Sequence, residues 1–291
     1  MRQQKSKNNE SGTQNRKKIL SAVSILCLIG LIIVGALLVL RWTDDLNEKK
    51  KASEVRENIE SARINVEQAD ETNEPAAETA GETAPEVLPE MAQALVMNSD
   101  IIGILEVGAD TCLYVTQGED NDFYLNHNYL KEEDEAGAAF LDVRCQIEPR
   151  DTHWIIHGHD MLNGTIFGQL KDFRDLEYLK NHPLVYLTLT YEKEIYVPYA
   201  ILDVNVDQSA DNYFKITEWN FETDEEFEAY TGYFKENSYF NIPVEIAPQD
   251  ELLTLSTCSY VYSDSRLLIA CRKLRENESE DEMKAIIQSV E

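Results

Sequence analysis

The sequence predicts a mainly β fold, a closed barrel with helical insertions, and three observations lead to this prediction. From residue 101 onward the chain contains short runs rich in β-branched and aromatic residues, which favour strands, separated by turn residues. Segments with helical periodicity are few in the same region. Ahead of it lies one long uncharged segment that divides a basic tip from an acidic remainder. Many short strands with few helices are typical of a closed β-barrel.

Seven runs are predicted to be strands. They cover residues 101–107, 112–117, 153–158, 184–191, 194–206, 252–258 and 266–274. A helix is predicted over 221–238, where four aromatic residues share one face, and one or two helical turns are predicted at 166–173. Residues 91–275 are therefore expected to form the globular domain. An acidic tail follows at 276–291, helical over 282–290.

The uncharged segment predicts a membrane anchor. Residues 19–40 carry no charge, and a helix of this length spans about 30 Å, the thickness of the hydrocarbon core of a bilayer. Residues 1–18 carry six basic residues and one acidic residue, so the positive-inside rule places this tip in the cytoplasm and the rest of the chain outside. A cleaved signal peptide is the alternative, but its apolar region is shorter, about 7–15 residues. We expect an uncleaved, single-pass anchor over residues 19–42 of a protein of the cell membrane.

Residues 43–90 are predicted to be an acidic stalk and linker. A sparse apolar stripe at Val55, Ile59, Ala62 and Val66 fits one face of a helix. We interpret this helix as a solvated stalk, with a partner-binding coil as the alternative. Residues 71–90 are poor in hydrophobic residues and rich in Glu, Thr, Ala and Pro, which predicts a disordered, self-repelling spacer.

Charge and cysteine usage limit the function. The net charge of -28 excludes a nucleic-acid partner, because phosphates would be repelled. One of the five cysteines lies in the apolar segment, and the other four are too widely spaced for a dense disulfide framework. Whether Cys112 and Cys145 pair is not decided by the sequence. At least one extracellular thiol is therefore expected to be free, and a free thiol there needs an explanation.

A catalytic role of Cys258, with Arg266 beside it, would explain a free extracellular thiol. Cys258 ends an apolar run and precedes a polar loop, which predicts a reachable thiol at the rim of the barrel. Arg266 begins the next run, so an antiparallel hairpin would bring it beside Cys258. Its guanidinium would then favour a thiolate and could donate to an oxyanion. The alternatives are a half-buried structural cysteine and an ordinary surface arginine.

A nucleophilic thiol also needs a group that transfers protons, and histidine is the expected partner. The chain has five: His127, His153, His157, His159 and His182. Three of them alternate along one predicted strand and share a face, which suggests a metal site as an alternative. The zinc-hydrolase pattern H-x-H-x-D-H is not met, however, so we predict no metal and no cofactor. His159 stands at the end of the strand and is the expected partner of Cys258, whereas His182 is interpreted as a turn residue.

These residues occur within a longer resemblance. Residues 98–274 resemble the class B sortases, membrane-anchored cysteine transpeptidases of Gram-positive bacteria. The blocks that carry the resemblance are NSDIIGILEV (98–107), GEDNDFYLNH (118–127), AGAAFLD (136–142), IIHGHDMLNGTIFGQL (155–170) and TLSTC (254–258), with Arg266 after a short loop. The fourth block is similar to the motif I-Y-G-H-x-M-x-x-G-x-M-F. Here His157 replaces the usual Tyr and Ile166 stands where Met is common. The helix at 221–238 resembles the insertion typical of class B.

The resemblance implies a sortase-type barrel of about eight strands and a mechanism. Cys258 would attack the Thr carbonyl of a C-terminal sorting signal in a secreted protein and form a thioester. His159 would act as acid and base, and Arg266 would stabilise the oxyanion. The acceptor would be an amine of peptidoglycan or a pilin lysine. Ser256 and Thr257 are weaker candidates for binding the substrate backbone.

Two other classes remain open from the sequence. One is an extracellular Cys/His protease or peptidoglycan hydrolase on another fold, which would not couple Cys258 to Arg266. The other is a non-enzymatic binding domain, including a degenerate sortase-like domain. The chain contains no LPxTG-type motif, so it resembles the enzyme and not a protein that the enzyme attaches.

Overall fold

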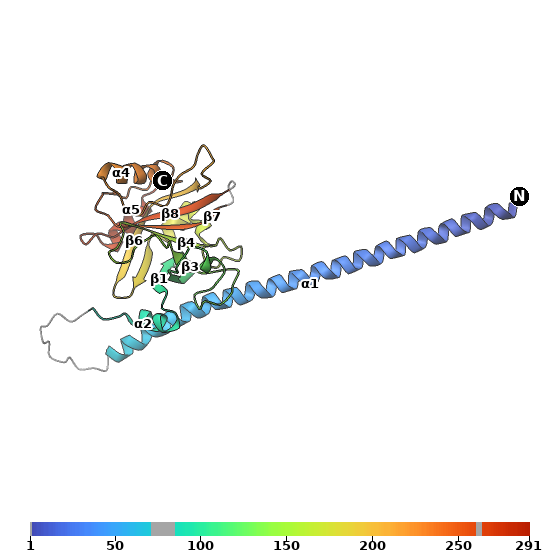
Figure 1. Cartoon of the computed structure of the whole chain (residues 1–291), viewed down its shortest axis with the longest axis horizontal. Helices are drawn as coiled ribbons and strands as arrows, with labels where there is room; N and C mark the ends of the chain where they lie inside the picture. Colours follow the sequence, from blue (N-terminus) through green and yellow to red (C-terminus); the bar gives the residue numbers. More distant parts are fainter. Residues whose placement is uncertain (1, 71–84, 260–263) are drawn as a thin grey trace. The chain divides into compact units, whose positions relative to one another are not determined.

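The computed structural model describes the backbone of residues 2–70, 85–259 and 264–291, and the side chains of residues 26–64, 85–257 and 264–291. The chain divides into two compact units, Met1–Lys50 and Lys51–Glu291. Helix α1 (Arg2–Asp70) begins in the first unit and ends in the second (Figure 1). Each unit is described by itself below.

The N-terminal part of α1 fits the predicted anchor by length and composition. Among the described residues, one helix, α1, is long and apolar enough to cross a bilayer. Its part with described side chains, Leu26–Ile64, contains a window of mean hydropathy 2.3. None of that window is buried. Such a continuous apolar surface is unfavourable in water and favourable in lipid.

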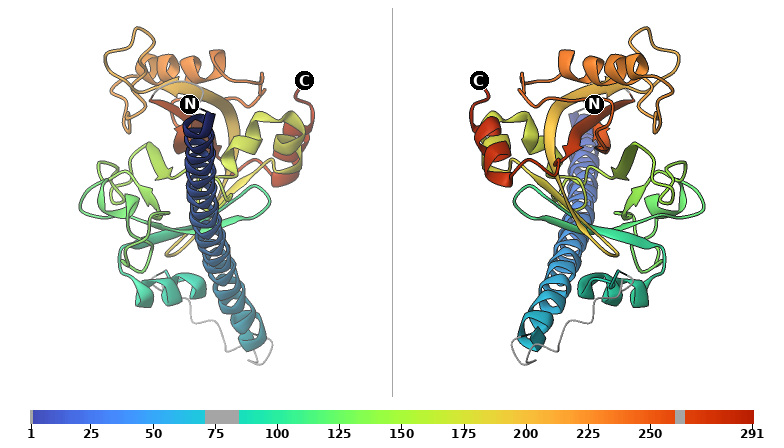
Figure 2. Two further views of the ribbon diagram at one scale, coloured as in Figure 1. Left: turned by 90° about the vertical axis from the view of Figure 1, so that its right-hand side faces the viewer. Right: turned by 90° about the vertical axis from the view of Figure 1, so that its left-hand side faces the viewer.

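The second unit is built on a closed barrel of eight strands in the order β1-β2-β3-β4-β7-β8-β6-β5 (Figures 1 and 2). The strands are β1 (Ile101–Val107), β2 (Thr111–Thr116), β3 (Ala139–Leu141), β4 (His153–Gly158), β5 (Val185–Leu189), β6 (Lys193–Asn205), β7 (Leu252–Ser259) and β8 (Ser265–Lys273). The predicted barrel is confirmed, and so are the seven predicted strands. The eighth, β3, has only three residues, too few to show a period.

Two parallel pairings determine where the site lies. β2 pairs with β3, and β4 pairs with β7, in parallel, whereas the other neighbours are antiparallel. Because β4 and β7 run in the same direction, both end at the same edge of the barrel. β8 starts at that edge, since it returns antiparallel to β7. The residues that end β4 and β7 and begin β8 therefore meet.

Helices and 3-10 turns connect and cover the strands. They are α2 (Pro89–Met97), η1 (Phe123–Leu125), η2 (Leu170–Arg174), α3 (Leu176–Asn181), α4 (Asp224–Glu236) and α5 (Glu280–Gln288). The helix predicted at 221–238 is α4, which the side chain of Thr223 caps and which packs against β6. The turn predicted at 166–173 is the 3-10 segment η2. His182 ends α3, in agreement with its interpretation as a turn residue.

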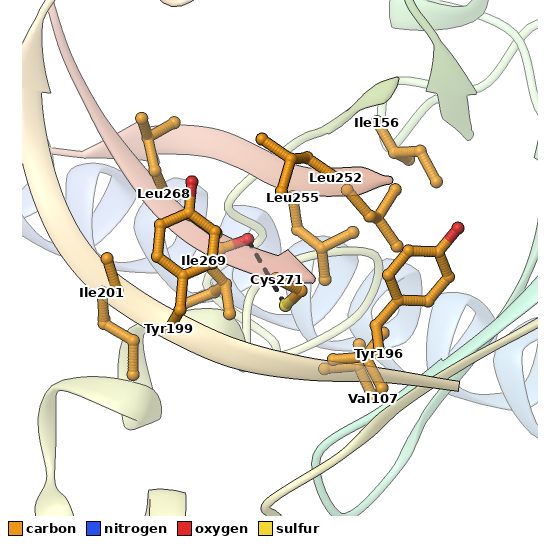
Figure 3. Packing of buried hydrophobic residues seen from close by; sticks show 14 of the residues in the cluster. Val107, Ile156, Tyr196, Tyr199, Ile201, Leu252, Leu255, Leu268, Ile269 and Cys271 are labelled. Atoms are coloured by element: carbon orange, nitrogen blue, oxygen red, sulfur yellow. Dashed lines mark hydrogen bonds between the residues drawn. The ribbon is translucent and has the colours of Figure 1, made fainter. Parts of the chain in front are cut away.

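The C-terminal helix is more than an acidic tail. α5 begins with a capping box between Ser279 and Glu282, as its sequence favours. Met283, Ile287 and Val290 are buried in the main core, and α5 packs against α3 (Figure 2). Figure 3 shows the centre of this core, where Tyr196 and Tyr199 of β6 lie among aliphatic side chains of neighbouring strands.

The interpretation of residues 44–70 as a solvated stalk is wrong for the stretch that the structure describes. Val55, Ile59 and Ala62 are buried, and the first two belong to a cluster with α2, β1 and β2. Beside this cluster, Arg63 contacts the carboxylates of Glu90 and Glu106. The apolar stripe therefore has a partner within its own chain, on elements far along the sequence.

The spacer predicted over residues 71–90 also extends too far toward the C-terminus, because its last residues belong to the folded domain. Residues 71–84 and the Val66 side chain lie outside the described residues. Val87 and Leu88 already pack against the small cluster, and α2 begins at Pro89. Glu90 is buried and forms ion pairs with Arg63 and Lys193. Ionic partners explain why an acidic residue can leave water here.

Ile59→Ala is expected to lower the free energy of unfolding by roughly 2–5 kcal/mol, because the Ile59 side chain is 1% exposed and its removal leaves a cavity. Ile64→Ala is the matched control on the same helix, since Ile64 is 50% exposed and should change stability by less than about 0.5 kcal/mol. Urea unfolding of both variants in detergent measures the difference. Equal stabilities would show that the stripe does not dock in solution.

Candidate active site

Cys258, Arg266 and Ser256 lie on one face of four adjacent strands. Side chains alternate along a strand, and residues paired across strands point to the same side. Phe140 of β3 pairs with His157 of β4, which pairs with Ser256 of β7. Two residues further along β7, Cys258 pairs with Arg266 of β8. The backbone register thus confirms the predicted hairpin, although the Cys258 side chain lies outside the described residues.

A pocket of about 510 Å³ opens on this face. Its walls come from the ends of β4, β7 and β8 and from residues 121–125 and 206–217. All four described candidates line it: His159, Ser256, Thr257 and Arg266. The Ser256 and Thr257 hydroxyl oxygens are buried and have no hydrogen-bond partner among the described residues. Leaving such groups unpaired costs about 1–3 kcal/mol each, so they are suited to receive a polar ligand.

The turn after β4 holds His159 in a defined orientation. The His159 Nε2 atom lies 2.8 Å from the Leu125 carbonyl oxygen. A carbonyl only accepts, so Nε2 carries the hydrogen and Nδ1 is the ring nitrogen that can exchange a proton. The His159 carbonyl accepts the backbone amides of Met161 and Phe167, which closes the turn. Gly158 precedes it because a Cβ there would lie 2.8 Å from the Phe167 ring.

Two of the three histidines predicted to share a face, His153 and His157, lie on β4 four residues apart, whereas His159 lies in the turn after it, and the three differ in environment. His153 is fully buried, and its ring nitrogens contact the Glu218 carbonyl and the Thr254 hydroxyl. Burial lowers the pKa of His153 to about 4, so it is neutral and structural. Within the described part of the chain, no group of three or more His, Cys, Asp or Glu is arranged to hold a metal ion.

A carboxylate that the sequence analysis did not single out also lines the pocket. Asp142 follows β3 and is fully buried, and it contacts both Arg144 and His157. Burial alone would raise its pKa, but the hydrogen bonds from Arg144 and His157 outweigh burial and hold the pKa of Asp142 well below its usual range. The one feature of the sequence that could have indicated Asp142 is its place, as an acidic residue, directly after the apolar run AAFL.

Three other cysteines are unsuited to nucleophilic chemistry. Cys112, Cys145 and Cys271 are buried free thiols, so the pairing of Cys112 with Cys145 is not formed. Burial raises the pKa of Cys112 to about 11 and that of Cys145 to about 12, and it raises the pKa of Cys271 further. Thiols with such pKa values are not thiolates at neutral pH.

As the pH is lowered from 6.5 to 4, His153 is expected to reduce the free energy of unfolding by roughly 3 kcal/mol. Its pKa is lower in the folded state, so the unfolded chain binds the extra proton and is favoured as the pH falls. His153→Gln should remove this part of the slope, and His182→Gln should retain it. Urea unfolding across this pH range measures the slope, and an unchanged slope in His153→Gln would contradict the assignment.

Comparison with known proteins places this chain in a family. No family model matches the chain. Sortase B of Listeria monocytogenes is 34% identical over 179 residues, which cover 60% of this chain and 69% of the relative. The X-ray structure of Clostridium perfringens sortase B matches with a TM-score of 0.58 and 26% identity, over 64% of this chain and 100% of that chain.

A third relative supports the fold. The Staphylococcus aureus sortase B–substrate complex matches with a TM-score of 0.64 and 20% identity, over 80% of this chain and 100% of that chain. A cysteine protease on another fold and a degenerate domain are not favoured by similarity of this extent. The chain therefore belongs to the class B sortases and is a cysteine transpeptidase.

Proposed function

We propose that Cys258, His159 and Arg266 are the catalytic residues of this transpeptidase. The Cys258 thiolate attacks the carbonyl carbon of the Thr residue in a sorting signal, and the tetrahedral intermediate collapses to a thioester. His159 gives its proton to the leaving amine and later takes a proton from the incoming amine. Arg266 donates to the oxyanion. The thioester divides one difficult exchange of amides into two easier steps.

The pairing of Cys258 with Arg266 is the observation that carries this proposal. A bulge or a shift of register by one residue would turn one of the two side chains to the opposite face. Instead they share the face on which His159 lines the pocket. The unpaired hydroxyls of Ser256 and Thr257 support a role in binding the substrate backbone.

Substrates and location follow from the same proposal. The substrates are secreted proteins with a C-terminal sorting signal, and the acceptor is an amine of cell-wall peptidoglycan or of a pilin. Residues 19–40 anchor the enzyme in the cell membrane with the N-terminus in the cytoplasm and the catalytic domain outside. The basic tip and the acidic remainder support this orientation, and substrate and acceptor both lie on that outer side.

The full chain in detergent, offered fluorogenic peptides with LPxTG, NPxTN or PPxTG signals, should cleave one class after Thr. Mass spectrometry should then detect the acyl adduct on Cys258. The full chain is used because α1 packs on the barrel domain through Val55 and Ile59. Absence of both cleavage and adduct with all three signals would contradict the proposal and favour a degenerate sortase-like domain.

A further inference from the structure

The pocket contains a second imidazole that the proposed mechanism does not use. His157 lines the pocket together with His159 and pairs in register with Ser256. Its side chain is 21% exposed, so a ligand in the pocket can reach it. The ring packs against Phe140, with centroids 5.3 Å apart. His157 is thus neither a buried structural histidine like His153 nor a loosely held surface residue.

Asp142 fixes the orientation of this imidazole. The His157 Nε2 atom lies 3.1 Å from Asp142 Oδ2. Asp142 also accepts from the Arg144 guanidinium at 2.8 and 2.6 Å and from the Arg144 amide at 3.0 Å, so its carboxylate is held ionised. An ionised carboxylate only accepts, which places a hydrogen on Nε2 and leaves Nδ1 to take up a proton. A carboxylate–imidazole pair of this kind stabilises an imidazolium when one forms.

The acceptor brings one more proton than His159 can remove. Amino groups have pKa values of about 8 at a chain terminus and about 10.4 in lysine, so the acceptor enters as an ammonium near neutral pH. An ammonium has no lone pair and cannot attack the thioester. It loses one proton to become a nucleophile and a second when the amide forms. In the proposed mechanism His159 accepts the second proton only.

We infer that His157, held by Asp142, is a further catalytic residue that accepts the first proton of the acceptor ammonium. This inference rests on the proposed function of Cys258 and His159. The ammonium N–H bond breaks and its proton forms a bond to His157 Nδ1, which gives a free amine and an imidazolium paired with Asp142. The amine then attacks the thioester carbon, its second proton passes to His159, and the C–S bond breaks to release the Cys258 thiolate. His157 finally returns its proton to water.

The surrounding charges are compatible with this role. Arg144 is held in a bidentate contact with Asp142 and stacks over Trp219, with 4.8 Å between the guanidinium carbon and the ring centroid. The carboxylate of Asp142 therefore accepts hydrogen bonds from both the Arg144 guanidinium, which is always charged, and the His157 imidazole. The titratable and charged side chains that line the pocket around His157 are Asp122, Asp142, Arg144, His159, Tyr213 and Arg266.

The test compares two acceptors at pH 7 with the full chain in detergent and a peptide that the wild type cleaves. Triglycine is mostly an ammonium at this pH, whereas hydroxylamine is mostly uncharged and needs no first deprotonation. In His157→Gln the side-chain amide can still donate to Asp142 but cannot take up a proton. The ratio of triglycine transfer to hydroxylamine transfer should fall about 10-fold or more. The ratio should recover near pH 9.5, where triglycine is already deprotonated in solution.

His182→Gln is the matched control, because it removes an imidazole that does not line the pocket, and its ratio should equal that of the wild type. His157→Tyr is a second variant, aromatic like histidine but unable to accept a proton at pH 7. An unchanged ratio in both His157 variants would overturn the inference and leave the proposed function standing. A wild type that uses hydroxylamine but not triglycine would also overturn it. Absence of any Cys258-dependent product would instead contradict the proposed function itself.

Discussion

Cys258→Ala is expected to reduce transpeptidation by about 10⁴-fold or more and to abolish the acyl adduct. Without the sulfur no thioester can form, and the remaining donors of the pocket can only bind and polarise the substrate. Cys258 is the last residue but one of β7 and pairs with Arg266 of β8, so an alanine fits the strand without strain. Cleavage of the fluorogenic peptide and mass spectrometry of the intact protein measure the two losses.

The buried cysteines provide matched controls for this experiment. Cys112→Ala and Cys145→Ala remove a thiol of raised pKa from the core of the same domain. Both should lower the melting temperature and retain the turnover of each folded molecule. If Cys258→Ala retained cleavage while Cys145→Ala lost it at equal folded fractions, the nucleophile would be Cys145 and the proposed assignment would be wrong.

The sequence was sufficient to predict how those parts of the candidate site that are close along the chain are brought together. Cys258 and Arg266 are eight positions apart, and a short hairpin between two apolar runs has few registers. His159 could be predicted as a candidate because the strand pattern stops at Gly158 and turn residues follow. Each of these inferences needs only local periodicity and chain reversal.

Asp142 shows where such reasoning fails. Its proposed role depends on the pairing of β3 with β4, and β3 is only three residues long. The pairing places Asp142 beside His157, 15 positions away, and no period in the sequence predicts that contact. Its partner Arg144 is two residues away, which is the spacing of an ordinary surface pair. Only the closed barrel shows that this carboxylate is buried and shared.

The stalk was misinterpreted for the same physical reason. Its apolar stripe at Val55 and Ile59 was visible, but the surface that receives it is made by α2 and by the outward-facing residues of β1 and β2. α2 itself was not predicted, because its nine residues follow the low-complexity segment directly. An amphipathic stripe indicates that a helix has a partner, whereas the fold determines which one.

Arg266→Ala is expected to lower kcat by about 10²–10³-fold with a smaller change in KM, because its proposed contact is to an oxyanion that exists only in the transition state. Arg266→Lys should recover only part of the loss, since an ammonium retains the charge but not the planar array of donors. Arg266 is the second residue of β8 and pairs with Cys258, and its guanidinium also contacts the Ser265 carbonyl at 3.2 Å. Single-turnover acylation of the full chain separates the two constants.

Arg275→Ala is the control for a lost arginine elsewhere on the domain. Arg275 pairs with Asp250 after β8 and does not line the pocket, so its removal should affect stability alone. A rise in KM with unchanged kcat in Arg266→Ala would assign Arg266 to binding of the ground-state substrate, because uniform binding changes KM only. A loss confined to kcat would instead support donation to the oxyanion. The two results thus distinguish the roles that an arginine opposite the nucleophile can have.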